Sequence, residues 1–83
     1  MTRNRVRDTV REFLSNLILD RVDESIEKTN NLLNPLVEDG SIDGFDTMYD
    51  DTDRSFAIDV YYIDGLCDTF TIQPGVTIQE KLS

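Results

Sequence analysis

Acidic side chains are the groups in this sequence that could most readily bind a ligand, and several of them share one short segment. The segment contains Asp46, Asp50, Asp51 and Asp53. Hard cations such as Ca2+ take clustered carboxylate oxygens, so a calcium loop is the first possibility to consider. An EF-hand loop needs glycine at its sixth position and glutamate at its twelfth. Counted from Asp51, these positions hold Phe56 and Tyr62. We therefore interpret the segment as a solvated turn and expect no metal site.

Catalytic chemistry has few side chains to use. The sequence contains no histidine and a single cysteine, Cys67, which removes the Ser–His and Cys–His arrangements and most zinc sites. Cys67 lies in a strand-like pattern, where a lone cysteine is typically a small buried apolar residue. Paired carboxylates for acid–base catalysis would need a cleft, and a chain of 83 residues leaves little room for one. We expect neither enzymatic activity nor a bound cofactor.

Four arginines stand at the start of the chain. They are Arg3, Arg5, Arg7 and Arg11. Cations near a helix N-terminus are disfavoured by the helix dipole, by about a few tenths of a kcal/mol each. We therefore interpret this basic end as a partner-binding surface that meets an acidic surface on another molecule. The acidic turn of a second copy, with Asp50, Asp51 and Asp53, would serve and would give a head-to-tail ring or filament. The alternative is that the arginines are simply solvated.

The remaining charge is strongly acidic, and the net charge is −9. Residues 38–68 hold ten acidic residues against Arg54 alone. Nucleic acid is not an expected partner, because binding to phosphates needs a basic face. No apolar run approaches the roughly 20 residues of a membrane span, and no apolar segment of a signal peptide follows the basic start. Because one cysteine also forms no internal disulfide, we expect synthesis in the cytoplasm and no membrane partner.

The first half of the chain has a helical period. The apolar residues that share one helix face are Val6, Val10, Phe13, Leu14, Leu17 and Ile18. They predict a helix over about residues 4–19. The pattern continues to Val37, either as one long helix or as two helices broken near Asp20, which could cap the second. One helix would be about 50 Å long, so a break is favoured.

The end of the helical half is marked by two residues that disfavour helix. Gly40 is placed to end the helix, because glycine tolerates the left-handed conformation. Pro35 disfavours helical geometry at Asn34. Either the helix kinks at this point, or Asn34 caps a short final turn with Pro35 at its first position.

The second half alternates with a period of two and predicts an antiparallel three-stranded meander. The expected strands cover about residues 43–49, 56–63 and 66–72. Asp64-Gly65 is a strong tight-turn pair between the last two strands. The fold class is therefore α+β, with one or two amphipathic helices packed on the sheet. We expect a single domain over 1–83, with a helical half at about 4–38, a β half at about 42–73 and an extended C-terminal arm at 74–83.

The C-terminal arm follows Pro74-Gly75 and contains a short apolar segment. Val76 and Ile78 give this segment extended character, and too little chain follows for it to pair back on itself. We expect it to bind a partner by adding a strand to the sheet edge of another subunit. A frayed tail is the alternative.

The order of these segments resembles the C-terminal inner domain of contractile-tail sheath proteins. The resemblance spans about residues 5–80 and centres on 40–45, which read Gly-Ser-Ile-Asp-Gly-Phe. The matching residues are Leu32, Leu33, Leu36, Gly40, Ile42, Gly44 and Phe45. The chain begins with its own Met1 and lacks the large outer domains of a sheath subunit. We therefore expect a stand-alone minimal version, similar to a sheath initiator at the baseplate.

The resemblance implies a virion structural protein of a contractile tail or a related injection apparatus. Its partners would be copies of itself, homologous sheath subunits, and a tail tube or baseplate protein. The resemblance further implies that Val76–Ile78 and the chain before Val6 act as exchanged arms, and that strand 54–63 belongs to the receiving sheet. The alternative is a cytoplasmic acidic binding module, or a nucleic-acid mimic, that occupies a basic protein. The arginine-rich start argues against mimicry.

Overall fold

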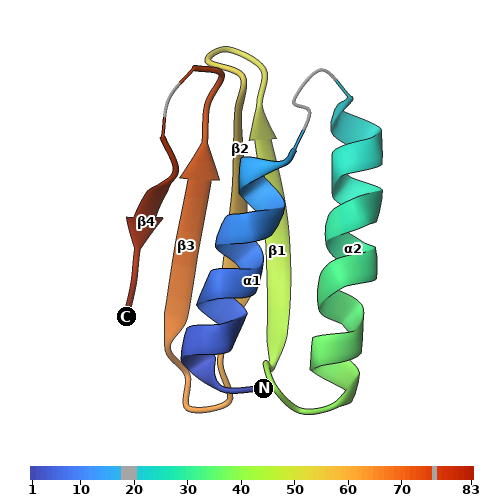
Figure 1. The fold of residues 1–83 in the computed structure, drawn as a ribbon, viewed down its shortest axis with the longest axis vertical. Helices are drawn as coiled ribbons and strands as arrows, with labels where there is room; N and C mark the ends of the chain where they lie inside the picture. Colours follow the sequence, from blue (N-terminus) through green and yellow to red (C-terminus); the bar gives the residue numbers. More distant parts are fainter. Residues whose placement is uncertain (18–20, 76) are drawn as a thin grey trace.

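The chain folds into two helices followed by a four-stranded antiparallel sheet, as Figure 1 shows. The structure is a computed structural model that describes residues 1–17, 21–75 and 77–83. The elements are α1 (Arg3–Ser15), α2 (Val22–Glu38), β1 (Gly44–Asp50), β2 (Ser55–Tyr61), β3 (Cys67–Ile72) and β4 (Gln79–Lys81). Their order in the sheet is β1-β2-β3-β4. The predicted α+β class, with helices preceding the strands, is confirmed.

The helical half consists of two helices, which decides between the two expectations stated above. α1 begins after Thr2, whose side chain accepts a hydrogen bond of 3.3 Å from the Arg5 backbone N–H. It ends at Ser15, earlier than the predicted residue 19. The expected cap, Asp20, lies outside the described residues. The position before α2 is Arg21, which makes no side-chain capping bond.

Pro35 lies inside α2, and the helix continues past it to Glu38. The expected separate turn capped by Asn34 is therefore wrong. Proline removes only one backbone donor, and here it does so in the last turn of the helix on an exposed side. The Asp39 N–H still donates to the Pro35 carbonyl at 3.0 Å. Gly40 then ends the helix with φ +79°, as predicted.

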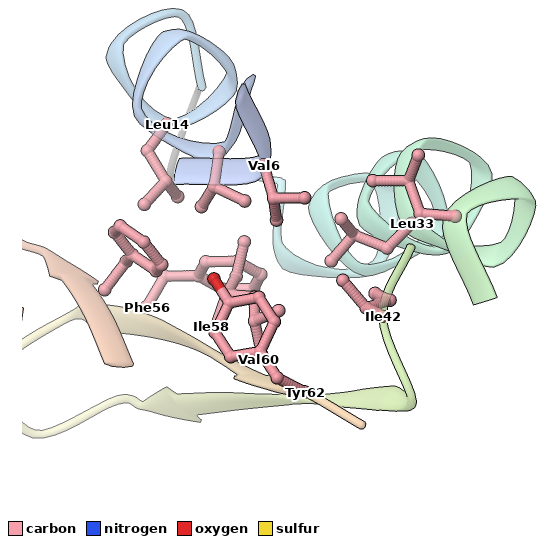
Figure 2. Packing of buried hydrophobic residues seen from close by; sticks show 11 residues of the cluster. Val6, Leu14, Leu33, Ile42, Phe56, Ile58, Val60 and Tyr62 are labelled. Atoms are coloured by element: carbon pink, nitrogen blue, oxygen red, sulfur yellow. The ribbon is translucent and has the colours of Figure 1, made fainter. Parts of the chain in front are cut away.

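The core lies between the helices and one face of the sheet. Figure 2 shows Val6 and Leu14 of α1 and Leu33 of α2 pointing toward side chains of β2. The buried apolar residues are Val6, Val10, Leu14, Leu33, Leu36, Ile42, Phe56, Ile58, Val60, Tyr62 and Phe70. The alternation in β2 and β3 puts every second side chain into this layer. α1 packs against β3, and α2 packs against β1.

The C-terminal arm corrects the sequence prediction. β4 pairs with β3 of the same chain, with Phe70 opposite Glu80, so the arm does fold back. The turn at Pro74-Gly75, where Gly75 has φ +73°, reverses the chain direction. Ile78 is half-buried against the core, whereas Val76 lies outside the described residues. The sequence does not predict this pairing because Gln79–Lys81 is polar, is exposed at every position and has no strand-like alternation.

The N-terminal segment is also held by its own chain. Residues 3–5 form the first turn of α1 and not a free arm. The Met1 amino group donates a hydrogen bond of 2.8 Å to Ser41 Oγ. This contact joins the start of the chain to the segment between α2 and β1.

The core predicts that substitutions at two positions of the sheet differ strongly in their effect on the free energy of unfolding. Replacing the fully buried Phe56 by alanine should lower the free energy of unfolding by about 3–5 kcal/mol, because it removes apolar contacts and leaves a cavity. Met48→Ala, on the exposed face of β1, should change it by less than about 0.5 kcal/mol. Urea denaturation of both variants measures the difference. Equal effects would contradict this description of the core.

Candidate functional site

The N-terminal arginines define the most highly organised polar region of the structure. Arg3, Arg7 and Arg11 are spaced by four residues, so they lie on one face of α1. Each forms an ion pair with an acidic residue of the β half. The pairs are Arg3–Asp64, Arg7–Asp68 and Arg11–Glu80. We call these three arginines the arginine row. It joins α1 to the β2–β3 turn, to β3 and to β4.

The central pair surrounds a fully buried carboxylate. Arg7 donates from Nε to Asp68 Oδ2 at 2.7 Å and from Nη2 to Oδ1 at 3.2 Å. The Asp68 side chain is 0% exposed, and the Arg7 side chain is 15% exposed. The Tyr62 hydroxyl donates to Oδ2 at 2.5 Å. The backbone N–H of Ser83 donates to Oδ1 at 2.9 Å, and its hydroxyl donates to the same oxygen at 3.2 Å. Both carboxylate oxygens are therefore satisfied.

These contacts fix the protonation states of the cluster. Burial alone would raise the pKa of Asp68, but the hydrogen bonds from Arg7, Tyr62 and Ser83 outweigh it and hold this pKa well below the usual range. Burial and the hydrogen bond to Asp68 raise the pKa of the Tyr62 hydroxyl. The hydrogen bond to Asp68 raises the pKa of Arg7. Asp68 is thus a fixed carboxylate beside a neutral tyrosine, which suits anchoring and not proton transfer.

The outer arginines of the row make further contacts. Arg3 Nη2 lies 2.6 Å from Asp64 Oδ2, and its guanidinium stands 4.2 Å from the centre of the Tyr62 ring. Arg11 binds Glu80 with two bonds, Nε to Oε2 at 2.5 Å and Nη2 to Oε1 at 2.7 Å. A two-pronged contact of this kind fixes orientation as well as charge. The row thereby offsets the cost of placing cations near the N-terminus of α1.

The predicted partner-binding residues separate into two groups. Arg3, Arg7 and Arg11 are used inside the chain, whereas Arg5 is exposed and forms no ion pair within the part of the chain that the structure describes. The acidic residues Asp50, Asp51 and Asp53 lie at the β1–β2 turn, exposed. Among the described residues, none of these three acids pairs with the arginine row. Their contact with a second copy stays a prediction.

The acidic turn is organised by its own backbone. Asp50 Oδ1 accepts the Thr52 N–H at 2.9 Å, and Asp53 Oδ1 accepts the Ser55 N–H at 3.0 Å. The hydrogen bond from Ser55 is the main reason why the pKa of Asp53 lies below its usual value. Within the described ranges, no group of three or more cysteine, aspartate or glutamate side chains could hold a metal ion.

Sequence reasoning missed the acidic partners of the row, although two signals were present. Arg7 and Arg11 directly follow Val6 and Val10, so the row borders the apolar stripe of the helix and can reach the sheet. Asp68 shares its strand face with the buried Phe70, and a buried carboxylate requires a charged or hydrogen-bonding partner. Neither signal identifies which arginine meets which acid.

No family model matches this sequence, and neither a curated protein nor a solved structure matches it. The resemblance to contractile-tail sheath proteins therefore stays a prediction. No helix in the described part of the chain is long and apolar enough to cross a membrane.

The central pair predicts a large stability effect. Asp68→Asn removes the charge that Arg7 binds and leaves a partly buried guanidinium without its counter-ion. The free energy of unfolding should fall by about 3 kcal/mol or more, as is typical when one partner of a buried pair is lost. Arg5→Ala, at an exposed position of the same helix, should change it by less than about 0.5 kcal/mol. Urea denaturation measures both variants. Equal free energies of unfolding would contradict a structural role for the Arg7–Asp68 pair.

The low pKa of Asp68 also predicts a pH dependence. Because this pKa is lower in the folded chain, the unfolded chain binds more protons between the two values. The stabilisation is fully present above the ordinary aspartate pKa of about 4 and is lost as the pH falls through the folded value. The stability difference between wild type and Asp68→Asn should be constant from about pH 8 to pH 5 and should shrink below about pH 4. A difference that grew on acidification would reverse the assigned sign.

Proposed function

We propose that this protein is a structural subunit of a contractile tail or a related injection apparatus, located in the virion tail. It would assemble around the tail tube by exchange of the C-terminal arm between copies or with homologous sheath subunits. The observation that carries this proposal is the attachment of β4. This edge strand has three residues, all exposed, and it is held to α1 by the contact between Glu80 and Arg11.

The contacts that hold the arm are ones that another copy can supply. Glu80 binds Arg11, and Ser83 binds Asp68 and Arg7. None of these contacts requires that the arm and α1 belong to the same chain. A swapped arm would pair with the same edge of β3 and meet the same arginines, so exchange keeps these contacts and changes only the chain that supplies them. Assembly of this kind needs no cofactor.

The second candidate is a small acidic binding module that occupies a basic protein. Its support is the internal use of the arginine row. Because Arg3, Arg7 and Arg11 are neutralised by acids of the same chain, the basic start no longer opposes an acidic outer surface. The exposed acids of the β1–β2 turn then face solvent together with the net charge of −9. Such a surface attracts basic partners.

Arm exchange is tested by a pair of charge reversals. Arg11→Glu and Glu80→Arg each place like charges where the structure has an ion pair. Mixed together, the two variants restore both opposite-charge contacts only if each chain gives its arm to the other. We expect each variant alone to have the monomer mass. The equimolar mixture should form a species of about twice the monomer mass, because reciprocal exchange joins two chains. Size-exclusion chromatography with light scattering measures this.

The matched control is Arg5→Glu mixed with Glu80→Arg. Arg5 is an exposed arginine of the same helix that makes no ion pair among the described residues, so this mixture should gain no mass. If the Arg11→Glu and Glu80→Arg mixture also keeps the monomer mass, β4 stays with its own chain and the arm-exchange proposal is wrong. A gain in the control mixture would show charge-driven association without exchange.

A further inference from the structure

One face of the sheet is not covered by any described element. Both helices lie on the opposite face, as Figure 2 shows. Because side chains alternate along a strand, the residues between the buried positions of β1, β2 and β3 point to the uncovered side. We call this surface the open face. The residues on which the inference depends are Asp46, Met48, Ala57, Asp59, Tyr61 and Thr71.

Two carboxylates stand together on the open face. Asp46 of β1 is directly opposite Asp59 of β2 in the strand register. Like charges in directly opposite positions destabilise a sheet. Each accepts one hydroxyl: Tyr61 donates to Asp46 Oδ2 at 3.0 Å, and Thr69 donates to Asp59 Oδ1 at 2.7 Å. No ion pair of the described residues includes either aspartate. Among the described residues, the cation nearest in the strand register is Lys81 of β4, which stands opposite Thr69 and forms no ion pair with either aspartate.

A hollow of about 480 Å3 lies on the same face, next to the residues one open-face position along from these carboxylates. Ala57, one of its lining residues, has Met48 opposite it on β1 and Thr71 opposite it on β3. The small alanine leaves space between two larger neighbours. Asp50 and Asp51 also line the hollow. Met48 is 64% exposed, so an unbranched apolar side chain stands in the middle of an acidic surface.

The combination of the apolar side chains of Met48 and Ala57 with nearby carboxylates matches one kind of side chain. Arginine and lysine carry an apolar stem and a charged head, and they pack the stem on apolar surface while the head stays polar. On the open face the stem would contact Met48 and Ala57. Asp46 and Asp59, two positions along their strands from those residues, would receive the head group. Nucleic acid and anionic membranes have the wrong charge for this surface.

We propose that the open face, around the hollow between Met48, Ala57 and Thr71, docks an arginine- or lysine-rich segment of another protein. The inference rests on the second candidate function, an acidic module that binds a basic protein. It specifies the surface to which that basic protein binds. It does not depend on arm exchange, because β4 occupies the same edge of β3 whichever chain supplies it.

The test uses a fluorescein-labelled peptide of alternating arginine and valine, with a peptide containing glutamine in place of arginine as the probe control. Fluorescence anisotropy is measured at about 0.05 M and 0.3 M salt, because surface charge contacts weaken as the screening length shortens. Wild type should bind the arginine peptide, more tightly at low salt, and should not bind the glutamine peptide.

Three variants distinguish the open face from general attraction to an acidic protein. Asp46→Asn with Asp59→Asn should weaken binding roughly tenfold, and Ala57→Leu, which fills the hollow, should do the same. Glu27→Gln with Glu38→Gln removes two exposed charges from α2 and should change binding by less than about twofold. The variant with Asp46→Asn and Asp59→Asn should also be no less stable than wild type, because it removes the repulsion between these two carboxylates.

The outcomes of this binding test distinguish a failure of the open-face inference from a failure of the acidic-module candidate. If both double variants weaken binding equally, the open face is the wrong surface, while the acidic-module candidate remains. If wild type does not bind the arginine peptide, the inference and the acidic-module candidate both fail. A wild-type dimer that buries Met48 and excludes the peptide would identify a second copy as the occupant and overturn the inference.

Discussion

The structure depends on burying one ionised carboxylate in a small protein. Removing the charge of Asp68 from water costs several kcal/mol unless close partners replace the lost hydration. Those partners come from three separate parts of the chain, namely Arg7 of α1, Tyr62 after β2 and Ser83 beyond β4. Arg7 reaches both carboxylate oxygens, Tyr62 adds a second donor to Oδ2, and Ser83 adds donors to Oδ1. Its burial therefore specifies how α1, the end of β2 and the C-terminal residues are placed on β3.

The placement of α1 by polar contacts matters because the backbones of the two helices stand apart. Within their described residues, no Cα atom of α1 lies within 8 Å of a Cα atom of α2. Each helix is instead placed by the sheet, α2 through β1 and α1 through β3. Apolar burial is not directional, whereas an ion pair requires two particular groups to meet. The ion pairs of Arg3, Arg7 and Arg11 fix the position of α1 along the strands.

Much of this fold could be predicted from local patterns, and the rest could not. The spacing of Val6 and Val10, the alternation around Ile58 and the glycine at position 40 each act over a few residues. The helix, the strand and the helix end that they predict are present, although α1 ends at Ser15 and not at about residue 19. β4 was missed because only its pairing with β3 makes it a strand. The row was placed on one helix, but its acidic partners lie 61 and 69 residues away in the chain. The number and position of charges in a sequence identify residues that could form ion pairs. They do not show which arginine meets which acidic residue.

The meeting of the first helix with the last residues also determines when folding can finish. Arg7 contacts Ser83 across 76 residues, nearly the whole chain. α1 is synthesised before β4, so Arg11 lacks Glu80 and Arg7 lacks Ser83 until residues 80–83 have left the ribosome. Contacts between distant residues also slow folding, because a large loop must close before they form. The contacts of α1 with Glu80 and Ser83 therefore form only after the two helices and the first three strands have been synthesised, and without them Arg11 keeps, among the described residues, only its contact with Asp8.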